Sequence, residues 1–155
     1  MIETPRIAKT SAQEVARIHL TIPREEIQAV MGPGIQEIMA VIAAQGVTPA
    51  GPWLTHHLRM NPGMFDFEIC VPVSAPVTPS GRVQPGQLRA ATVVRTVHRG
   101  AYAGLGAAWG DFGAWIAEHG LKPADDRWEC YLVGPESTPD PTDWRTELNR
   151  PLAGA

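Results

Sequence analysis

The segment Trp128-Glu129-Cys130-Tyr131 combines a carboxylate with two aromatic rings, a combination suited to binding a cation. In an extended strand Glu129 and Tyr131 point to one face, while Trp128 and Cys130 point to the other. A partly buried carboxylate attracts a cation at reduced dielectric, and neighbouring rings add a cation–π contact. The same environment suits a carboxyl group to general acid–base chemistry. Glu129 is therefore the leading candidate for the charged group of a ligand site.

Other residue types that bind metals or act as nucleophiles give weaker signals. His56 and His57 are adjacent, so in a strand they point to opposite faces and do not form a metal pair. Cys70 and Cys130 lack the spacing of a zinc site, a disulfide framework or a Cys–His nucleophile. No phosphate-binding loop, nucleophile elbow or dinucleotide fingerprint is present. We therefore expect neither a metal nor a cofactor.

The elements that position these residues are predicted from an internal repeat. An offset of 74 residues places Gly46 over Gly120 and Pro49 over Pro123, and the flanking residues match as well. An offset of 79 places Glu68 over Glu147 near the end of each copy. Ordered matches of this kind are typical of a duplicated structural unit. We therefore predict two copies of one module.

Each module is predicted to contain a strand, a helix and two further strands. Runs of β-branched residues predict the first strands, at 15–22 and 91–97. Apolar residues at 3–4 spacing predict the helices, the first starting near Pro33 after a separate turn at 25–31, and Gly46 and Gly120 are expected at the helix C-termini. The remaining strands are predicted at 54–60, 64–71, 128–133 and 143–149.

The predicted fold is α+β, in a single domain over residues 1–155. Module one spans about 13–73, module two spans about 88–153, and the Pro-rich segment 74–87 is expected to be a loop. Joining both modules in one curved antiparallel sheet avoids an unpaired edge. The two helices would then cover one face, with pseudo-two-fold symmetry between the modules. We expect a groove between the halves, a natural place for a small-molecule site.

Alternation along the last module assigns residues to the two sheet faces. Trp128, Cys130 and Leu132 are expected to face the helix, and Glu129 and Tyr131 to face the groove. The offset of 74 matches Glu129 to Thr55 and Tyr131 to His57, which would also line the groove. Trp109 is expected in the helix core, Trp115 at a pocket rim, and Asp66 and Glu68 on a solvated face.

Composition and charge limit the possible partners. The 155 residues have a net charge of −3, which gives no electrostatic basis for binding DNA or RNA. Few residues precede the first predicted strand, too few for a helix-turn-helix, so we expect no direct nucleic-acid binding. No signal-peptide core and no apolar run of about 18 residues is seen, which favours a cytoplasmic protein without a membrane partner. We expect a monomer or a homodimer.

Several phrases, in their order and spacing, resemble the GyrI-like (gyrase-inhibitor-like) effector-binding family. They are Val97-His98-Arg99-Gly100-Ala101-Tyr102, Trp115-Ile116-x-x-x-Gly120, Trp128-Glu129-x-Tyr131-Leu132 and Thr146-Glu147-Leu148-x-x-Pro151-Leu152, with Gly51-Pro52 and Asp66-Phe67-Glu68-x-x-x-Pro72-Val73 in the first half.

The resemblance covers roughly residues 13–153 and implies paired modules around a central groove that binds small, often planar or cationic, amphipathic molecules. In that family some members are fused to DNA-binding domains, others stand alone, and a further branch hydrolyses cyclopropane-bearing alkylating natural products. Glu129 matches the family's groove acid, and Tyr102 matches a characteristic tyrosine. His57 stands where the family usually has a tyrosine, and a protonated histidine would repel a cationic ligand.

Two functions follow from these expectations. The first is a stand-alone protein that captures an amphipathic ligand, aromatic or cationic, with Glu129 as its charged partner; the other expected ligand contacts are Tyr131, Tyr102, His57, Trp53, Thr55 and Trp115. The alternative is a hydrolase of cyclopropane-bearing alkylating compounds, with Glu129 and Tyr102 as its catalytic residues. A single acid among aromatic rings favours binding, and whether the protein is also an enzyme stays open. Dispersed acidic residues disfavour a third possibility, a protein–protein inhibitor.

Overall fold

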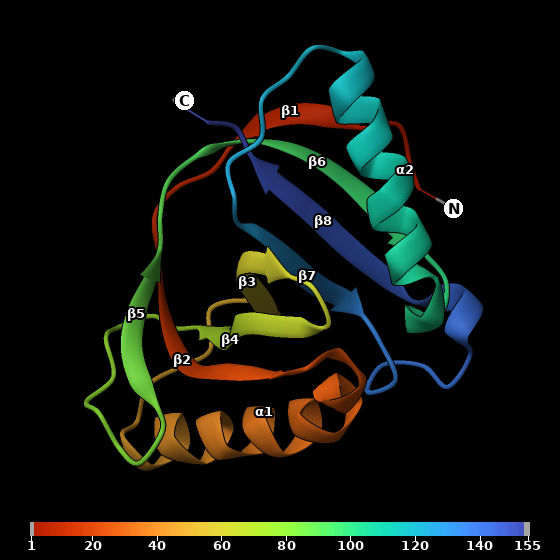
Figure 1. The fold of residues 1–155 in the computed structure, drawn as a ribbon. Coiled ribbons are helices and arrows are strands. Elements are labelled where there is room, and N and C mark those ends of the chain that lie inside the picture. The colour runs from red at the N-terminus through yellow and green to blue at the C-terminus, as the bar shows by residue number, and fades with distance from the viewer. Residues whose placement is uncertain (1, 154–155) are drawn as a thin grey trace. The chain divides into compact units, whose positions relative to one another are not determined.

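The fold is α+β, with antiparallel strand pairing, as the sequence predicts. It is seen in a computed structural model that describes residues 2–153. The chain divides into two compact units: one is Ser11–Ala90, and the other combines the first ten residues with those from Ala91 onward. Each unit has one helix packed on one face of its strands (Figure 1). We call these the 11–90 unit and the 91–155 unit.

The 11–90 unit is built on the strand order β3-β4-β2-β5. Its elements are β2 (Gln13–Pro23), η1 (Arg24–Glu26), α1 (Ile27–Ala44), β3 (Leu54–Asn61), β4 (Met64–Pro72) and β5 (Gln84–Leu88). Ile38 and Ile42 of α1 pack against Ile18 of β2 and against Phe67 and Ile69 of β4. The burial of these aliphatic and aromatic side chains holds α1 on the sheet.

The 91–155 unit has the strand order β1-β6-β8-β7. Its elements are β1 (Arg6–Lys9), β6 (Thr92–Arg99), η2 (Tyr102–Gly104), α2 (Leu105–Glu118), β7 (Arg127–Val133), η3 (Pro141–Asp143) and β8 (Arg145–Pro151). Ala108, Phe112 and Ile116 of α2 pack against Val94 of β6 and Leu148 of β8. Their spacing of three to four residues is the apolar periodicity that predicted this helix.

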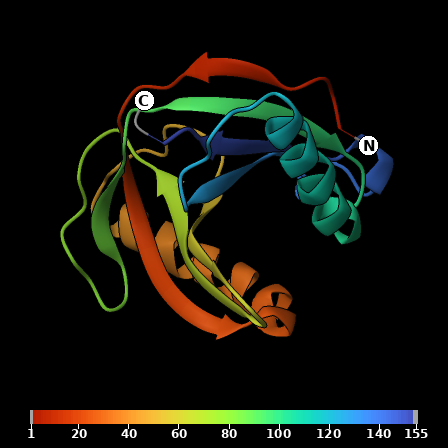
Figure 2. The ribbon, with the colours of Figure 1, turned by 45° about the horizontal axis from the view of Figure 1, so that its top comes forward.

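Two short strands are exchanged between the halves of the sequence. β1 precedes β2 in the chain but pairs with β6, whereas β5 precedes β6 but pairs with β2 (Figures 1 and 2). The sequence analysis predicts no strand over 6–9 and expects the whole of 74–87 to be a loop, so it misses both strands. Each strand is at the end of its strand order, where a proline such as Pro85 is tolerated because a pairing partner lies on one side only.

The two units repeat the same strand register. Glu129 is paired with Leu148 across β7 and β8, and Thr55 is paired with Ile69 across β3 and β4. These pairs are related by the offsets of 74 and 79 that the sequence shows. Thr55 is therefore the structural counterpart of Glu129. Descent of both halves from one duplicated ancestor stays a prediction.

Local irregularities are repeated as well. A register shift occurs between His57 and Arg59 in one unit, and another occurs between Tyr131 and Val133 in the other. Gly46 and Gly120, just after the two helices, have φ of 68° and 67°. This left-handed conformation favours glycine at a helix C-terminus, as the sequence predicts.

The start of α1 differs from the prediction. The helix begins at Ile27, and Pro33 lies inside it rather than at its first turn. Residues 25–31 therefore belong to η1 and α1 and do not form a separate turn. A proline inside a helix removes one backbone hydrogen bond, yet packing of Ile38 and Ile42 against the sheet outweighs this local cost.

The stretch Arg24–Ala44 is long enough to cross a membrane, and its most apolar 18-residue window has a mean hydropathy of 1.4. The test uses length and composition alone. The sequence analysis expected no apolar segment of this length, and this helix does not fit that expectation. Signal sequences and the mostly buried core helices of water-soluble proteins satisfy the same criterion, and 17% of this window is buried. In this structure Ile38 and Ile42 on this helix are buried against β2 and β4.

Candidate ligand-binding site

Glu129 lies in the middle of β7 with only 8% of its surface exposed. The indole Nε1–H of Trp109 donates to its Oε2 at 2.6 Å, and the Tyr131 hydroxyl donates to its Oε1 at 2.7 Å. Burying a carboxylate is costly unless donors replace the lost water, and these two side chains supply such donors. Both oxygens of Glu129 are thus anchored by aromatic residues.

The prediction that Glu129 and Tyr131 face away from the helix is wrong. Trp109 belongs to α2 and donates directly to Glu129, and Leu148, opposite Glu129, is part of the α2 core. By alternation Trp128 points to the other face, where it is 2% exposed. The alternation along β7 is misleading because the side of the strand with more apolar residues does not face α2. The helix can cover the side that carries Glu129 because Trp109 on α2 donates a hydrogen bond to this carboxylate.

Tyr102, at the start of η2, extends the aromatic surroundings of Glu129. Its ring meets Tyr131 edge-on, with 5.7 Å between centroids, and lies 4.9 Å from the ring of Trp144. Burial, followed by the negative charges of Glu136 and Glu129, raises the pKa of the Tyr102 phenol. Tyr102 therefore stays a neutral hydrogen-bond donor at physiological pH. Trp144 and Glu136 are site neighbours that the sequence analysis does not identify.

Gly134, the residue after β7, leaves room for the Tyr102 hydroxyl. A Cβ placed on Gly134 would lie 2.6 Å from that oxygen and 2.9 Å from a carboxylate oxygen of Glu136. Contacts this short cannot exist, so the residue following β7 has to be glycine for Tyr102 to lie where it does.

Trp109 has a second contact on its ring face. The guanidinium carbon of Arg127 lies 4.6 Å from the Trp109 ring centroid, and the Phe112 ring lies 5.7 Å away on the same helix. The expectation that Trp109 is a core residue holds, since it packs against the α2 cluster. Its role beside Glu129 is missed, although a buried indole usually needs an acceptor for its N–H.

The remaining predicted site residues have contacts within their own units. Trp115 stacks on His119, with 3.8 Å between ring centroids, and packs against the α2 core. Thr55 and His57 are buried in the 11–90 unit, where His57 stacks on Phe67 at 5.3 Å. Trp53, just before β3, packs against the core that Ile38 and Ile42 form there. The structure thus joins Glu129, Tyr131 and Tyr102 within one unit; a groove shared by both halves stays a prediction.

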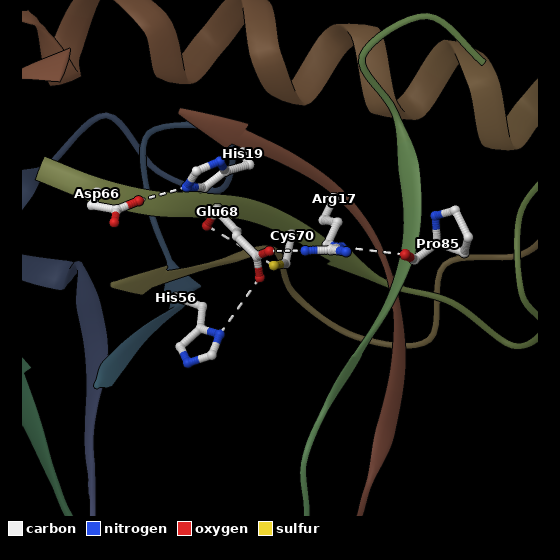
Figure 3. Close-up of polar contacts among 7 residues, drawn as sticks. All are labelled: Arg17, His19, His56, Asp66, Glu68, Cys70 and Pro85. Carbon is white, nitrogen blue, oxygen red and sulfur yellow. Dashed lines mark hydrogen bonds and ion pairs between the residues drawn. The ribbon is translucent and has the colours of Figure 1, made fainter. Parts of the chain in front are cut away.

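The face of the 11–90 sheet that is turned away from α1 holds a polar cluster (Figure 3). Arg17 of β2 forms an ion pair with Glu68 of β4, and His56 Nδ1 of β3 lies 3.6 Å from the same carboxylate. His19 Nε2 lies 2.5 Å from Asp66 Oδ1. His56 and His57 therefore do point to opposite faces, as predicted.

Glu68 is 7% exposed, so the prediction that Glu68 lies on a solvated face is wrong. Burial on its own would raise the pKa of Glu68, but hydrogen bonds and Coulomb attraction from His56 and Arg17 outweigh it and lower that pKa. An equivalent pair, Arg95 and Glu147 at 3.5 Å, occupies the matching register positions of the other unit. These paired charges stabilise the sheet and leave Glu129 as the stronger candidate for ligand binding.

Metal and thiol chemistry find no support in the described residues. Within 2–153 no group of three or more His, Cys, Asp or Glu side chains is arranged to hold a metal ion. Burial, followed by the nearby Glu147 charge, raises the pKa of the Cys130 thiol to about 12. Cys70 is buried as well. A thiol with so high a pKa is a poor nucleophile near neutral pH.

Solved structures with the same fold include proteins of several kinds. The C-terminal domain of EcmrR matches with a TM-score of 0.87 and 20% identity over 98% of both chains. EcmrR in a complex with DNA matches with a TM-score of 0.85 and 20% identity over 97% of this chain and 57% of the EcmrR chain. The present chain therefore spans little more than half of that EcmrR chain.

Two other structures are more distant. SAV2435 bound to tetraphenylphosphonium matches with a TM-score of 0.71 and 15% identity, covering 98% of this chain and 95% of that one. A hydrolase encoded by lin2189 from Listeria innocua matches with a TM-score of 0.67 and 12% identity, and the match covers 96% of this chain and 91% of that one. At these identities the likeness establishes the fold alone. A comparison with curated proteins gives no match.

The family is established by a match over most of the chain. Residues 3–153 match the model of the GyrI-like small molecule binding domain, which agrees with the resemblance seen in the sequence motifs. The chain therefore belongs to the GyrI-like family of small-molecule-binding domains.

Proposed function

We propose that this protein binds an amphipathic organic cation, with Glu129 as the counter-charge and Tyr131 and Tyr102 as aromatic contacts. The observation that supports this most strongly is the carboxylate of Glu129, 8% exposed and anchored by the donors of Trp109 and Tyr131. A carboxylate in such surroundings interacts with a cation more strongly than one in water does. The rings add apolar area and cation–π attraction.

The preorganisation of Glu129 favours binding further. Its two donors hold the carboxylate in one orientation before a ligand arrives, so little side-chain entropy is lost on association. Tyr102 packs on both Tyr131 and Trp144 and stays protonated, so it offers a ring and a neutral donor rather than a second negative charge. These contacts fit a cation with flat apolar groups.

The comparisons support a ligand of this class. The family is described as small-molecule-binding, and SAV2435 has been seen with tetraphenylphosphonium, a lipophilic cation. Likeness to SAV2435 is limited to the fold, so tetraphenylphosphonium serves here as a probe and not as the natural ligand.

Titration calorimetry with tetraphenylphosphonium chloride tests the proposal. We expect Glu129→Gln to weaken binding by more than about tenfold, since it removes the charge and keeps the shape. Neutral triphenylphosphine oxide should bind both proteins alike. Glu118→Gln, an exposed change on α2, is the matched control and should leave tetraphenylphosphonium affinity unchanged. Equal affinities of Glu129→Gln and the native protein would reject the assignment of Glu129.

A hydrolase acting on cyclopropane-bearing alkylating compounds is the second candidate. It is favoured by Glu129 and the protonated Tyr102 lying on the same aromatic cluster, one able to orient water and the other able to donate a hydrogen bond. Incubation with such a compound, followed by mass spectrometry, would detect a ring-opened product that has gained one water. Turnover no faster than that of Glu129→Gln would reject this candidate.

A further inference from the structure

A built-in cation lies close to the proposed site. Arg127 is the first residue of β7 and, two positions before Glu129, projects from the same face of the strand. Its guanidinium carbon lies 4.6 Å from the centroid of the Trp109 ring. The indole N–H of that same ring donates to Glu129 at 2.6 Å. The Trp109 ring thus lies between the positive guanidinium of Arg127 and the carboxylate of Glu129.

This arrangement affects the two sides of Glu129 differently. On the Trp109 side, Arg127 already uses the ring face that would attract a cation, and its positive charge opposes a second one nearby. On the other side, Tyr131 and Tyr102 present aromatic rings, and the hydroxyl of Tyr131 contacts the carboxylate directly. A ligand cation approaching from the tyrosine side avoids most of the repulsion.

We propose that Arg127 is a specificity-determining residue that keeps cations away from the Trp109 side of Glu129 and so selects monocations over dications. The inference rests on the proposed function, because it assumes that a cation binds at Glu129. An amphipathic monocation can place its charge at Glu129 and its rings on Tyr131 and Tyr102. A dication whose second charge reaches the Trp109 side comes within the field of Arg127, which lowers its affinity.

Two related dyes make the test specific. Ethidium is a monocation, and propidium shares its phenanthridinium ring system but has an additional quaternary ammonium group. Their affinities for the native protein, freed of nucleic acid, can be measured by fluorescence anisotropy. Arg127→Met removes the charge and keeps a long apolar side chain, whereas Arg127→Lys keeps the charge.

We expect Arg127→Met to tighten ethidium binding severalfold and propidium binding by a larger factor, so that the ratio of the two affinities moves toward one. Arg127→Lys should keep the native ratio, which a purely structural role for Arg127 would not require. Thermal melting followed by circular dichroism establishes that both variants are folded. If Arg127→Met unfolds, the propidium-to-ethidium ratio of Arg127→Gln decides instead.

The outcomes separate this inference from the proposed function. If the native protein binds ethidium and Glu129→Gln weakens it, while loss of the Arg127 charge leaves the ratio unchanged, the role of Arg127 is rejected and the proposed function stands. If ethidium binding is absent or does not depend on Glu129, both are rejected.

Discussion

At the scale of single residues, one hydrogen bond determines the character of the candidate site. Trp109 is partly buried against the α2 core, and its indole N–H needs an acceptor there. Glu129 supplies that acceptor, and Trp109 in turn replaces part of the water that Glu129 loses. This hydrogen bond therefore offsets part of the free-energy cost of removing both groups from water. Together with the Tyr131 hydroxyl, Trp109 holds both carboxylate oxygens of Glu129 in place within the aromatic cluster.

The Glu68 cluster gives a prediction about stability and pH. The pKa of Glu68 is lowered from its ordinary value of 4.5, so below that value the unfolded chain takes up a proton that folded Glu68 resists. Stability from this group is therefore present above about pH 4.5 and is lost as the pH falls through the lowered pKa. At pH 7 we expect Glu68→Gln to reduce the free energy of unfolding by about 1 kcal/mol.

Urea unfolding between pH 7 and pH 3 checks this prediction. The difference between native protein and Glu68→Gln should shrink toward zero at the acidic end. Glu118→Gln, on the exposed surface of α2, should follow the native curve throughout. A difference that stays constant across this range would contradict the assigned role of Glu68.

At the scale of elements, helix ends and helix interiors place opposite demands on glycine. Gly46 and Gly120 adopt φ near +68° just after α1 and α2, a region that costs other residues about 1 kcal/mol. Gly113 lies inside α2 with open space around it, and there glycine is the unfavourable choice. The two helices thus end where their sequence signals indicate.

This contrast predicts effects of opposite sign for the same substitution. Gly46→Ala and Gly120→Ala should each lower the free energy of unfolding by about 1 kcal/mol. Gly113→Ala should raise it by about 0.5–1 kcal/mol, since alanine favours the helix. Chemical denaturation of the three variants measures these changes. Stabilisation by alanine at position 46 or 120 would argue against the left-handed caps.

At the scale of the whole chain, the exchanged strands tie the two halves of the sequence together. β1 leads directly into β2 but pairs with β6, and β5 leads into β6 but pairs with β2. Each compact unit therefore contains a strand supplied by the other half of the sequence. Neither of the predicted modules includes all the strands of one compact unit.

Removing residues 2–10 tests this exchange. We expect backbone amides of β6, which pair with β1, to lose about tenfold or more in protection from hydrogen exchange. Amides of β2 over 15–17, which pair with β5, should keep their protection although they are nearer in sequence to the deletion. Mass spectrometry of peptides from both strands distinguishes the two. Loss of protection confined to β2 would contradict the observed pairing.

Local signals in the sequence were sufficient for much of the fold. Apolar spacing predicted α2, β-branched runs predicted β2 and β6, and the glycine signals placed both helix ends, because short-range packing and backbone preferences determine these features. The start of α1 was misplaced, since Pro33 gives a local signal for a helix start that sheet packing overrides. The short strands β1 and β5 have little local pattern and form because distant partners offer free edges.

The sequence by itself determined the α+β class, the two helices, the six longer strands and the resemblance to the family, because spacing and motif order suffice for these, and it singled out Glu129 and Tyr102 as candidate site residues. The tertiary structure decided which face of β7 meets α2, that Trp109 and Tyr131 are the donors to Glu129, and that Arg127 covers the Trp109 ring. Alternation along a strand separates two faces but does not say which one a helix covers. That choice depends on contacts between residues about twenty positions apart, and only the folded chain brings those together.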